Sequence, residues 1–197
     1  MKGPLAAFHR ANALTYAALL SAIGAIAAAV HGNAGAAGAL IAASVIADTF
    51  DGKFARLFPR TTEERALGVQ LDSLSDAIAF GAAPCICMTL LAPRGLGWIE
   101  GAWWAAFAIF AACAITRLAF YNVTQERASG FVGLPAPVAA LVWSSALLAD
   151  PGAAIAGIVI FVSAVAMVLP LQIPRPRGAS FVAFVAWPVA VIAAHLV

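Results

Sequence analysis

The chain has 197 residues, of which 63% are hydrophobic and only 10% are charged, and its formal net charge is +2. Soluble domains usually contain about a quarter charged residues, so this composition excludes a soluble protein and predicts an integral membrane protein. We find no basic surface with interleaved aromatic residues, which argues against nucleic-acid binding. Because apolar runs follow one another along the whole chain, we expect one domain over residues 1–197.

Apolar segments that reach or approach the length needed to cross a ~30 Å hydrocarbon core recur along the sequence. Turn-forming residues, as in "HGNAG" and "DPG", separate them. The sequence therefore predicts an all-α, polytopic membrane bundle of about six to seven transmembrane helices. The predicted spans are 13–31, 35–57, 67–92, 101–122, 133–149, 153–170 and 179–196.

The basic residues predict the orientation, because translocation across the membrane disfavours loops that carry Lys and Arg. With the N-terminus in the cytoplasm, only Arg94 falls on the outer side. We therefore expect a protein of the inner (cell) membrane with a cytoplasmic N-terminus. Ten basic residues then lie on the inner side: Lys2, Arg10, Lys53, Arg56, Arg60, Arg65, Arg117, Arg127, Arg175 and Arg177.

Four aspartates, Asp48, Asp51, Asp72 and Asp76, interrupt the second and third predicted spans. At ~1.5 Å rise per residue, the first and last lie ~14 Å from the inner helix ends, and the middle two lie ~8–9 Å deep. Spacings of three and four residues keep each pair on one helix face. We therefore expect Asp48 to face Asp76 and Asp51 to face Asp72, in a pocket that opens to the cytoplasm.

Clustered carboxylates in a low-dielectric environment need protons or cations. Divalent cations with oxygen ligands satisfy this need, and a Mg²⁺ site that keeps some waters suits a phosphate-bearing substrate. One aspartate alone would more often be a structural partner, a proton relay or a counter-ion, and a divalent-cation or proton transporter is the alternative class. A transporter needs polar residues toward the outer side, where these helices are apolar, so the sequence favours an enzyme.

Small residues beside the aspartates leave room for a ligand. Gly52, Ala55 and Gly68 each lie within about one turn of an aspartate, and Arg56 offers a planar guanidinium that suits phosphate oxygens. The complete pattern is Asp48-x-x-Asp51-Gly52-x-x-Ala55-Arg56, eleven residues, then Gly68-x-x-x-Asp72-x-x-x-Asp76.

This pattern resembles the signature of the CDP-alcohol phosphotransferase family, integral membrane enzymes that move a phosphatidyl or similar group from a CDP-linked donor to an alcohol. Every fixed position is filled, and the eleven-residue spacer is a few residues longer than usual. The resemblance implies a homodimer and two bound ions, Mg²⁺ or Mn²⁺. It implies that Asp76 is also the catalytic base. The implied metal ligands are Asp48, Asp51, Asp72 and Asp76, and the implied donor-binding residues are Gly52, Ala55, Arg56 and Gly68.

Further stretches resemble the phosphatidylserine synthase branch of that family: "LDSLSDAIAFGAAP" (71–84), "TRLAFYNV" (116–123), "FVGLPAPVAA" (131–140) and "ANALT" (11–15). This likeness implies CDP-diacylglycerol as donor, L-serine as acceptor and CMP as product, which is the CDP-diacylglycerol–serine O-phosphatidyltransferase reaction. Glycerol 3-phosphate, inositol phosphate and other alcohols are the alternative acceptors. Arg117 and Asn122 are the expected contacts of the acceptor or phosphate, whereas we interpret Arg175 and Arg177 as topology markers.

Overall fold

The computed structural model describes residues 5, 8–91, 98–124, 130–149 and 152–197. Lys2, Arg94 and Arg127, which contribute to the predicted orientation, lie outside the described residues. The predicted all-α, polytopic fold is confirmed. The helices are α1 (Ala13–Val30), α2 (Ala34–Ala55), α3 (Thr62–Asp76), α4 (Ala83–Leu91), α5 (Trp98–Thr124), α6 (Ala136–Leu147), α7 (Ala153–Val168) and α8 (Ala179–Leu196).

A π-helical segment, Ala77–Ala82, joins α3 to α4, so that Thr62–Leu91 is one continuous helix of 30 residues. This helix begins before the predicted start at residue 67. Thr61 and Glu64 form a capping box, in which the Thr61 hydroxyl accepts from the Glu64 amide and the Glu64 carboxylate accepts from the Thr61 amide. The polar first turn is stabilised by this cap and not by apolar burial. The apolar pattern therefore places the start of the helix too late.

Five of the helices in the described part of the chain are long and apolar enough to cross a membrane, namely Arg10–Val30, Ala34–Ala55, Thr62–Leu91, Glu100–Thr124 and Ala179–Leu196. The other two predicted spans form shorter helices. With 12 residues in α6 and 16 in α7, they extend ~18 and ~24 Å, less than a ~30 Å hydrocarbon core.

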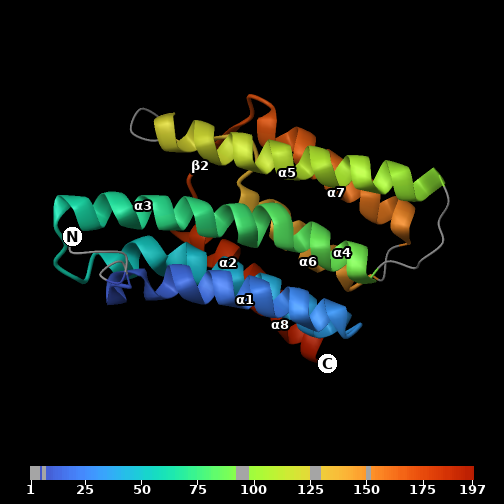
Figure 1. The fold of residues 1–197 in the computed structure, drawn as a ribbon, viewed down its shortest axis with the longest axis horizontal. Coiled ribbons are helices and arrows are strands. Elements are labelled where there is room, and N and C mark those ends of the chain that lie inside the picture. Colours follow the sequence, from blue (N-terminus) through green and yellow to red (C-terminus); the bar gives the residue numbers. More distant parts are fainter. Residues whose placement is uncertain (1–4, 6–7, 92–97, 125–129, 150–151) are drawn as a thin grey trace.

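The helices pack with their long axes roughly aligned (Figure 1). α5 and α7 lie together on one side, α1 lies against α2, and α8 packs on the other side of α2. Many residues at these contacts are alanines without measurable exposure, such as Ala22, Ala25 and Ala37. Such small side chains allow close backbone approach in lipid, as the alanine-rich sequence indicates.

Two short strands, β1 (Gly130–Val132) and β2 (Gln172–Pro174), pair antiparallel with Phe131 opposite Ile173. The sequence pattern does not predict this strand pair. Gly133 follows β1 with φ of +75°, and an added Cβ there would contact the Met167 carbonyl. The strand pair brings the segment before α8 next to the start of α6, and both segments contribute to the cavity described below.

Candidate active site

Three of the four aspartates form one group of carboxylates. Asp48 lies on α2, and Asp72 and Asp76 lie one turn apart on α3. One carboxylate oxygen from each residue lies within 4.8 Å of the others, and all three side chains are half-buried. Asp48 and Asp76 are close enough to interact directly. Two consecutive helices therefore place three acidic groups at one level of the bundle.

Asp51 is bonded to α1 and is not part of this group of three. Its Oδ2 accepts a hydrogen bond of 3.0 Å from the Thr15 hydroxyl. The Thr15 carbonyl accepts a 3.2 Å hydrogen bond from Ser75, which lies on α3 beside Asp76. Asp51 also interacts with Asp72. Thr15 thus connects α1, α2 and α3 at the level of the aspartates.

The four small or basic signature residues lie on α2 and α3, the helices that carry the aspartates, or at the C-terminal end of α2. Gly52 and Arg56 are exposed, and Ala55 is buried at the end of α2. A Cβ added to Gly52 would meet no atom within 4 Å, whereas one added to Gly68 would contact the side chains of Arg60 and Asn12. The surface around Gly52 is therefore open.

A cavity of about 700 Å³ adjoins the three carboxylates. Its wall is mainly apolar and includes side chains from β1, β2, α6 and α8. Asp51 and the four small or basic signature residues are not part of this wall. The polar and charged residues that line it are Asp48, Thr49, Asp72, Ser73, Asp76, Arg117, Tyr121, Asn122, Arg175 and Ser180.

Two arginines of this wall flank the ring of Phe131. The Arg117 guanidinium lies 5.3 Å from the centre of the Tyr121 ring and 5.8 Å from that of Phe131, and Arg175 lies 5.8 Å from Phe131. Arg117 is only 6% exposed, and its Nε has no hydrogen-bond partner among the described residues. Its charge acts on Asp48 and Asp76. A buried, partly unsatisfied guanidinium next to a cavity is suited to an anionic ligand.

Asn122 contacts the cavity from the same helix as Arg117. Its side-chain amide donates a 2.6 Å hydrogen bond to the Ser73 hydroxyl, and that hydroxyl donates to the Val69 carbonyl at 3.0 Å. Ser73 therefore holds the Asn122 side chain against α3, next to Asp72.

The amino-acid sequence of this chain was compared with those of known protein families. The profile of the CDP-alcohol phosphatidyltransferase family matches residues 8–192, nearly the whole chain. The chain belongs to this family. The family resemblance drawn from the signature is therefore confirmed.

Three relatives illustrate where the chain lies among CDP-alcohol phosphatidyltransferases. The CDP-diacylglycerol–serine O-phosphatidyltransferase of Mycobacterium tuberculosis is 32% identical over 139 residues, which cover 66% of this chain and 46% of that protein. The Helicobacter pylori protein of the same name is 37% identical over 113 residues, with coverages of 56% and 45%. The archaetidylserine synthase of Methanothermobacter thermautotrophicus is 32% identical over 152 residues, with coverages of 76% and 62%. The chain thus spans about half the length of the two bacterial relatives.

CDP-alcohol phosphatidyltransferases are metal-dependent, and the three grouped carboxylates of this chain fit a divalent cation. Carboxylate oxygens are the ligands that Mg²⁺ and similar hard cations prefer. The single positive charge of Arg117, which acts on Asp48 and Asp76, can offset only part of the charge of three carboxylates. The donor set therefore matches a site for bound cations.

Three residues of the site were not identified from the sequence as parts of it. Thr15 occupies a matching position in "ANALT", so its place in the motif was a usable signal. Ser73 follows Asp72 directly, but nothing in the sequence indicated its bond to Asn122. Arg175 lines the cavity because β2 pairs with β1, whereas we interpreted it as a topology marker.

Proposed function

We propose that this protein transfers a phosphatidyl group from CDP-diacylglycerol to L-serine and releases CMP. The observation that carries the proposal is that three carboxylates and two arginines line one cavity of a CDP-alcohol phosphatidyltransferase. The names of the bacterial relatives support serine as the acceptor. The archaeal relative is named for an archaetidyl product, so a donor with another lipid tail is the nearest alternative.

The donor would bind where the signature leaves space on α2 and α3. The open surface at Gly52, with Ala55 and Gly68, would receive the nucleotide, and Arg56 would contact a donor phosphate. In this arrangement the diphosphate of the donor would lie next to the aspartates. The lipid part would then remain in the membrane, where the apolar helix surfaces lie.

Asp48, Asp51, Asp72 and Asp76 would hold two divalent ions, Mg²⁺ or Mn²⁺. Bound there, the ions supply positive charge to the phosphate oxygens of the donor. The Thr15 hydroxyl keeps Asp51 in place through its 3.0 Å hydrogen bond.

Asp76 would be the general base of the transfer. It accepts the proton of the serine hydroxyl as the serine oxygen forms a bond to the phosphorus that carries diacylglycerol. The bond between that phosphorus and the CMP oxygen breaks, and CMP leaves with the electron pair. Asp76 is suited to this role because its carboxylate faces both the grouped aspartates and the cavity.

The cavity would hold the acceptor. A carboxylate of serine would pair with Arg117, which the rings of Tyr121 and Phe131 keep in place, and with Arg175. The carbonyl oxygen of Asn122 would accept from the serine ammonium group. Two arginines also suit a phosphate, so glycerol 3-phosphate and inositol phosphate remain the alternative acceptors.

We further propose that the chain acts as a single domain and a homodimer in the inner (cell) membrane. Ten basic residues of the sequence against one support an active site that faces the cytoplasm.

The test uses the purified full chain in detergent with Mg²⁺, CDP-diacylglycerol and labelled L-serine. We expect release of CMP together with labelled phosphatidylserine, and neither product without serine. Parallel reactions contain glycerol 3-phosphate or inositol phosphate. Release of CMP with one of these and not with serine would reject the serine assignment, and release with no acceptor would reject the proposed transfer.

A further inference from the structure

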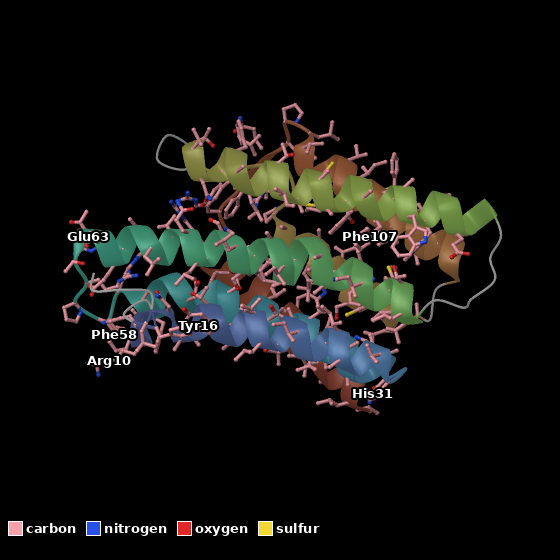
Figure 2. All side chains as sticks on the ribbon, viewed as in Figure 1. Arg10, Tyr16, His31, Phe58, Glu63 and Phe107 are labelled. Carbon is pink, nitrogen blue, oxygen red and sulfur yellow. The ribbon has the colours of Figure 1, made fainter. Side chains whose placement is uncertain are left out.

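Ser73 connects the helix that carries Asp72 and Asp76 to the helix that carries Asn122. α3 and α5 lie side by side, and their side chains meet in the space between the two ribbons (Figure 2). There the half-buried Ser73 donates a 3.0 Å hydrogen bond to the Val69 carbonyl and accepts one of 2.6 Å from the side-chain nitrogen of Asn122. Its hydroxyl thus forms one bond within α3 and one bond to α5.

The single proton of this hydroxyl fixes the orientation of the Asn122 amide. A serine hydroxyl has one proton to donate and lone pairs that accept. Because the Val69 carbonyl takes that proton, the Ser73 oxygen can only accept on the side of Asn122. It therefore binds the amide NH₂ group, and the carbonyl oxygen of Asn122 is turned away from Ser73. A reversed amide would bring two oxygens together, and one of the two hydrogen bonds of Ser73 would be lost.

The carbonyl oxygen of Asn122 is available to a ligand in the cavity. Asn122 lines the cavity, and within the described ranges its side chain forms a hydrogen bond only to Ser73. The side chain is half-buried, so leaving its oxygen without a donor costs free energy. Arg117 and Arg175 line the same cavity and can only donate. The cavity therefore presents two cationic donors and one neutral acceptor.

We propose that Ser73 is a positioning residue that selects an acceptor alcohol with an ammonium group. This inference rests on the proposed function, because it assumes that the acceptor binds in this cavity. The Asn122 carbonyl oxygen, which Ser73 keeps turned toward the ligand, accepts a charge-assisted hydrogen bond from the ammonium group. The two arginines bind the carboxylate of the same molecule. The acceptor class is thus an amino alcohol that also carries an acidic group, as L-serine does.

Acceptors without an amine lose the charged part of this contact. Glycerol 3-phosphate and inositol phosphate offer an anionic group to the arginines, but they offer only neutral hydroxyls to the Asn122 oxygen. A hydrogen bond with an ionised partner is roughly twice as strong as one between neutral groups. An anionic group placed at Asn122 would face an oxygen with no proton between them. The orientation of one amide therefore favours an ammonium group at this point of the cavity.

Equilibrium binding tests the role of Ser73 separately from transfer. Isothermal titration calorimetry measures the dissociation constants of L-serine and 3-hydroxypropanoate for the purified full chain with Mg²⁺ and CMP, where no lipid donor is present to react. The second compound keeps the carboxylate and hydroxyl of serine but has hydrogen in place of the ammonium group. We expect the unmodified chain to bind serine roughly tenfold or more tightly than 3-hydroxypropanoate.

Ser73→Ala should lose most of this preference. Without the Ser73 oxygen the Asn122 amide can turn its NH₂ group toward the ligand, so serine binding should weaken about tenfold, with little change for 3-hydroxypropanoate. In the transfer reaction the same variant should raise KM for serine, with kcat and KM for CDP-diacylglycerol nearly unchanged. Ser73→Thr retains a hydroxyl at this position and should keep the preference.

Ser145→Ala is the matched control. The Ser145 hydroxyl also donates to a carbonyl of its own helix, that of Leu141, at 2.8 Å, and it accepts a 3.0 Å hydrogen bond from the indole nitrogen of Trp187. The control therefore removes the same pair of bonds at another helix contact, and it should keep the ratio of the two dissociation constants. Circular dichroism verifies that each variant retains its helices.

Three results would overturn the inference: an unmodified chain that binds the two acids equally, Ser73→Ala with an unchanged ratio, or an equal loss of both ligands in Ser73→Ala. The equal loss would identify Ser73 as a support of the whole site and not of amine selection. If serine is transferred while Ser73→Ala keeps the ratio, only this inference fails. If the ratios follow the expectation while CDP-diacylglycerol and serine yield no phosphatidylserine, only the proposed transfer fails.

Discussion

Replacement of Asp76 by asparagine should nearly abolish CMP release while the protein stays folded. Asparagine has almost the same size, and the Asp76 side chain is only half-buried, so the packing of α3 should be retained. The change removes one of three carboxylates that lie within 4.8 Å of one another, and it removes the proposed proton acceptor. A positioned general base contributes ~10²–10⁴-fold to the rate. We therefore expect kcat to fall at least ~100-fold.

The assay measures CMP release from CDP-diacylglycerol at saturating serine and Mg²⁺, and calorimetry measures CMP binding by the same preparation. Glu64→Gln is the matched control, because it also removes one carboxylate from α3. Glu64 is half-buried like Asp76, and glutamine preserves the capping box. We expect the control to keep near-normal activity. An Asp76→Asn enzyme with more than a third of the original kcat would refute the role of Asp76 as base.

Three further substitutions test other parts of the site and fold. Thr15→Val removes the 3.0 Å hydrogen bond to Asp51, so the Mg²⁺ concentration for half-maximal CMP release should rise roughly tenfold. Arg175→Ala should raise KM for serine roughly tenfold in steady-state kinetics, with KM for CDP-diacylglycerol nearly unchanged. Gly38→Ala places a methyl group against the ring of His195, and this overpacking of ~1–3 kcal/mol should lower Tm by several degrees in a thermal unfolding scan.

Each of these substitutions has a control or a contradicting result. Thr124→Val also removes a hydroxyl, one that bonds only the carbonyl of its own helix, and should leave the Mg²⁺ dependence unchanged. Arg177→Ala removes a neighbouring exposed cation that does not line the cavity, so an equal rise in KM for serine would attribute the effect to overall charge. Adding His195→Ala to Gly38→Ala should restore much of the lost Tm, and no recovery would contradict the steric explanation.

The positions of the helices could be predicted because membrane-spanning helices are long apolar runs between turn residues. The predicted span at 179–196 and the helix Ala179–Leu196 agree at both ends. The start of α3 could not be found in this way, because its first turn is polar and depends on the Thr61–Glu64 cap. The strand pair at Phe131 and Ile173 is too short for a periodic pattern, and it joins segments far apart in the chain.

The closeness of the aspartates could be predicted because it follows from helix geometry. Spacings of three and four residues on two consecutive helices brought Asp48 next to Asp76 and Asp51 next to Asp72. Arg175 could not be placed, since its position depends on the pairing of two three-residue strands.

The most direct test of the account is a Mn²⁺ titration followed by electron paramagnetic resonance, in which bound Mn²⁺ loses the six-line signal of the free ion. The purified chain with CDP-diacylglycerol should bind Mn²⁺, and Asp48→Asn and Asp72→Asn should each greatly weaken that binding. Mg²⁺ should displace the bound Mn²⁺. An unmodified chain whose signal stays that of free Mn²⁺ with the donor present would contradict the claim that these aspartates bind the ions needed for transfer.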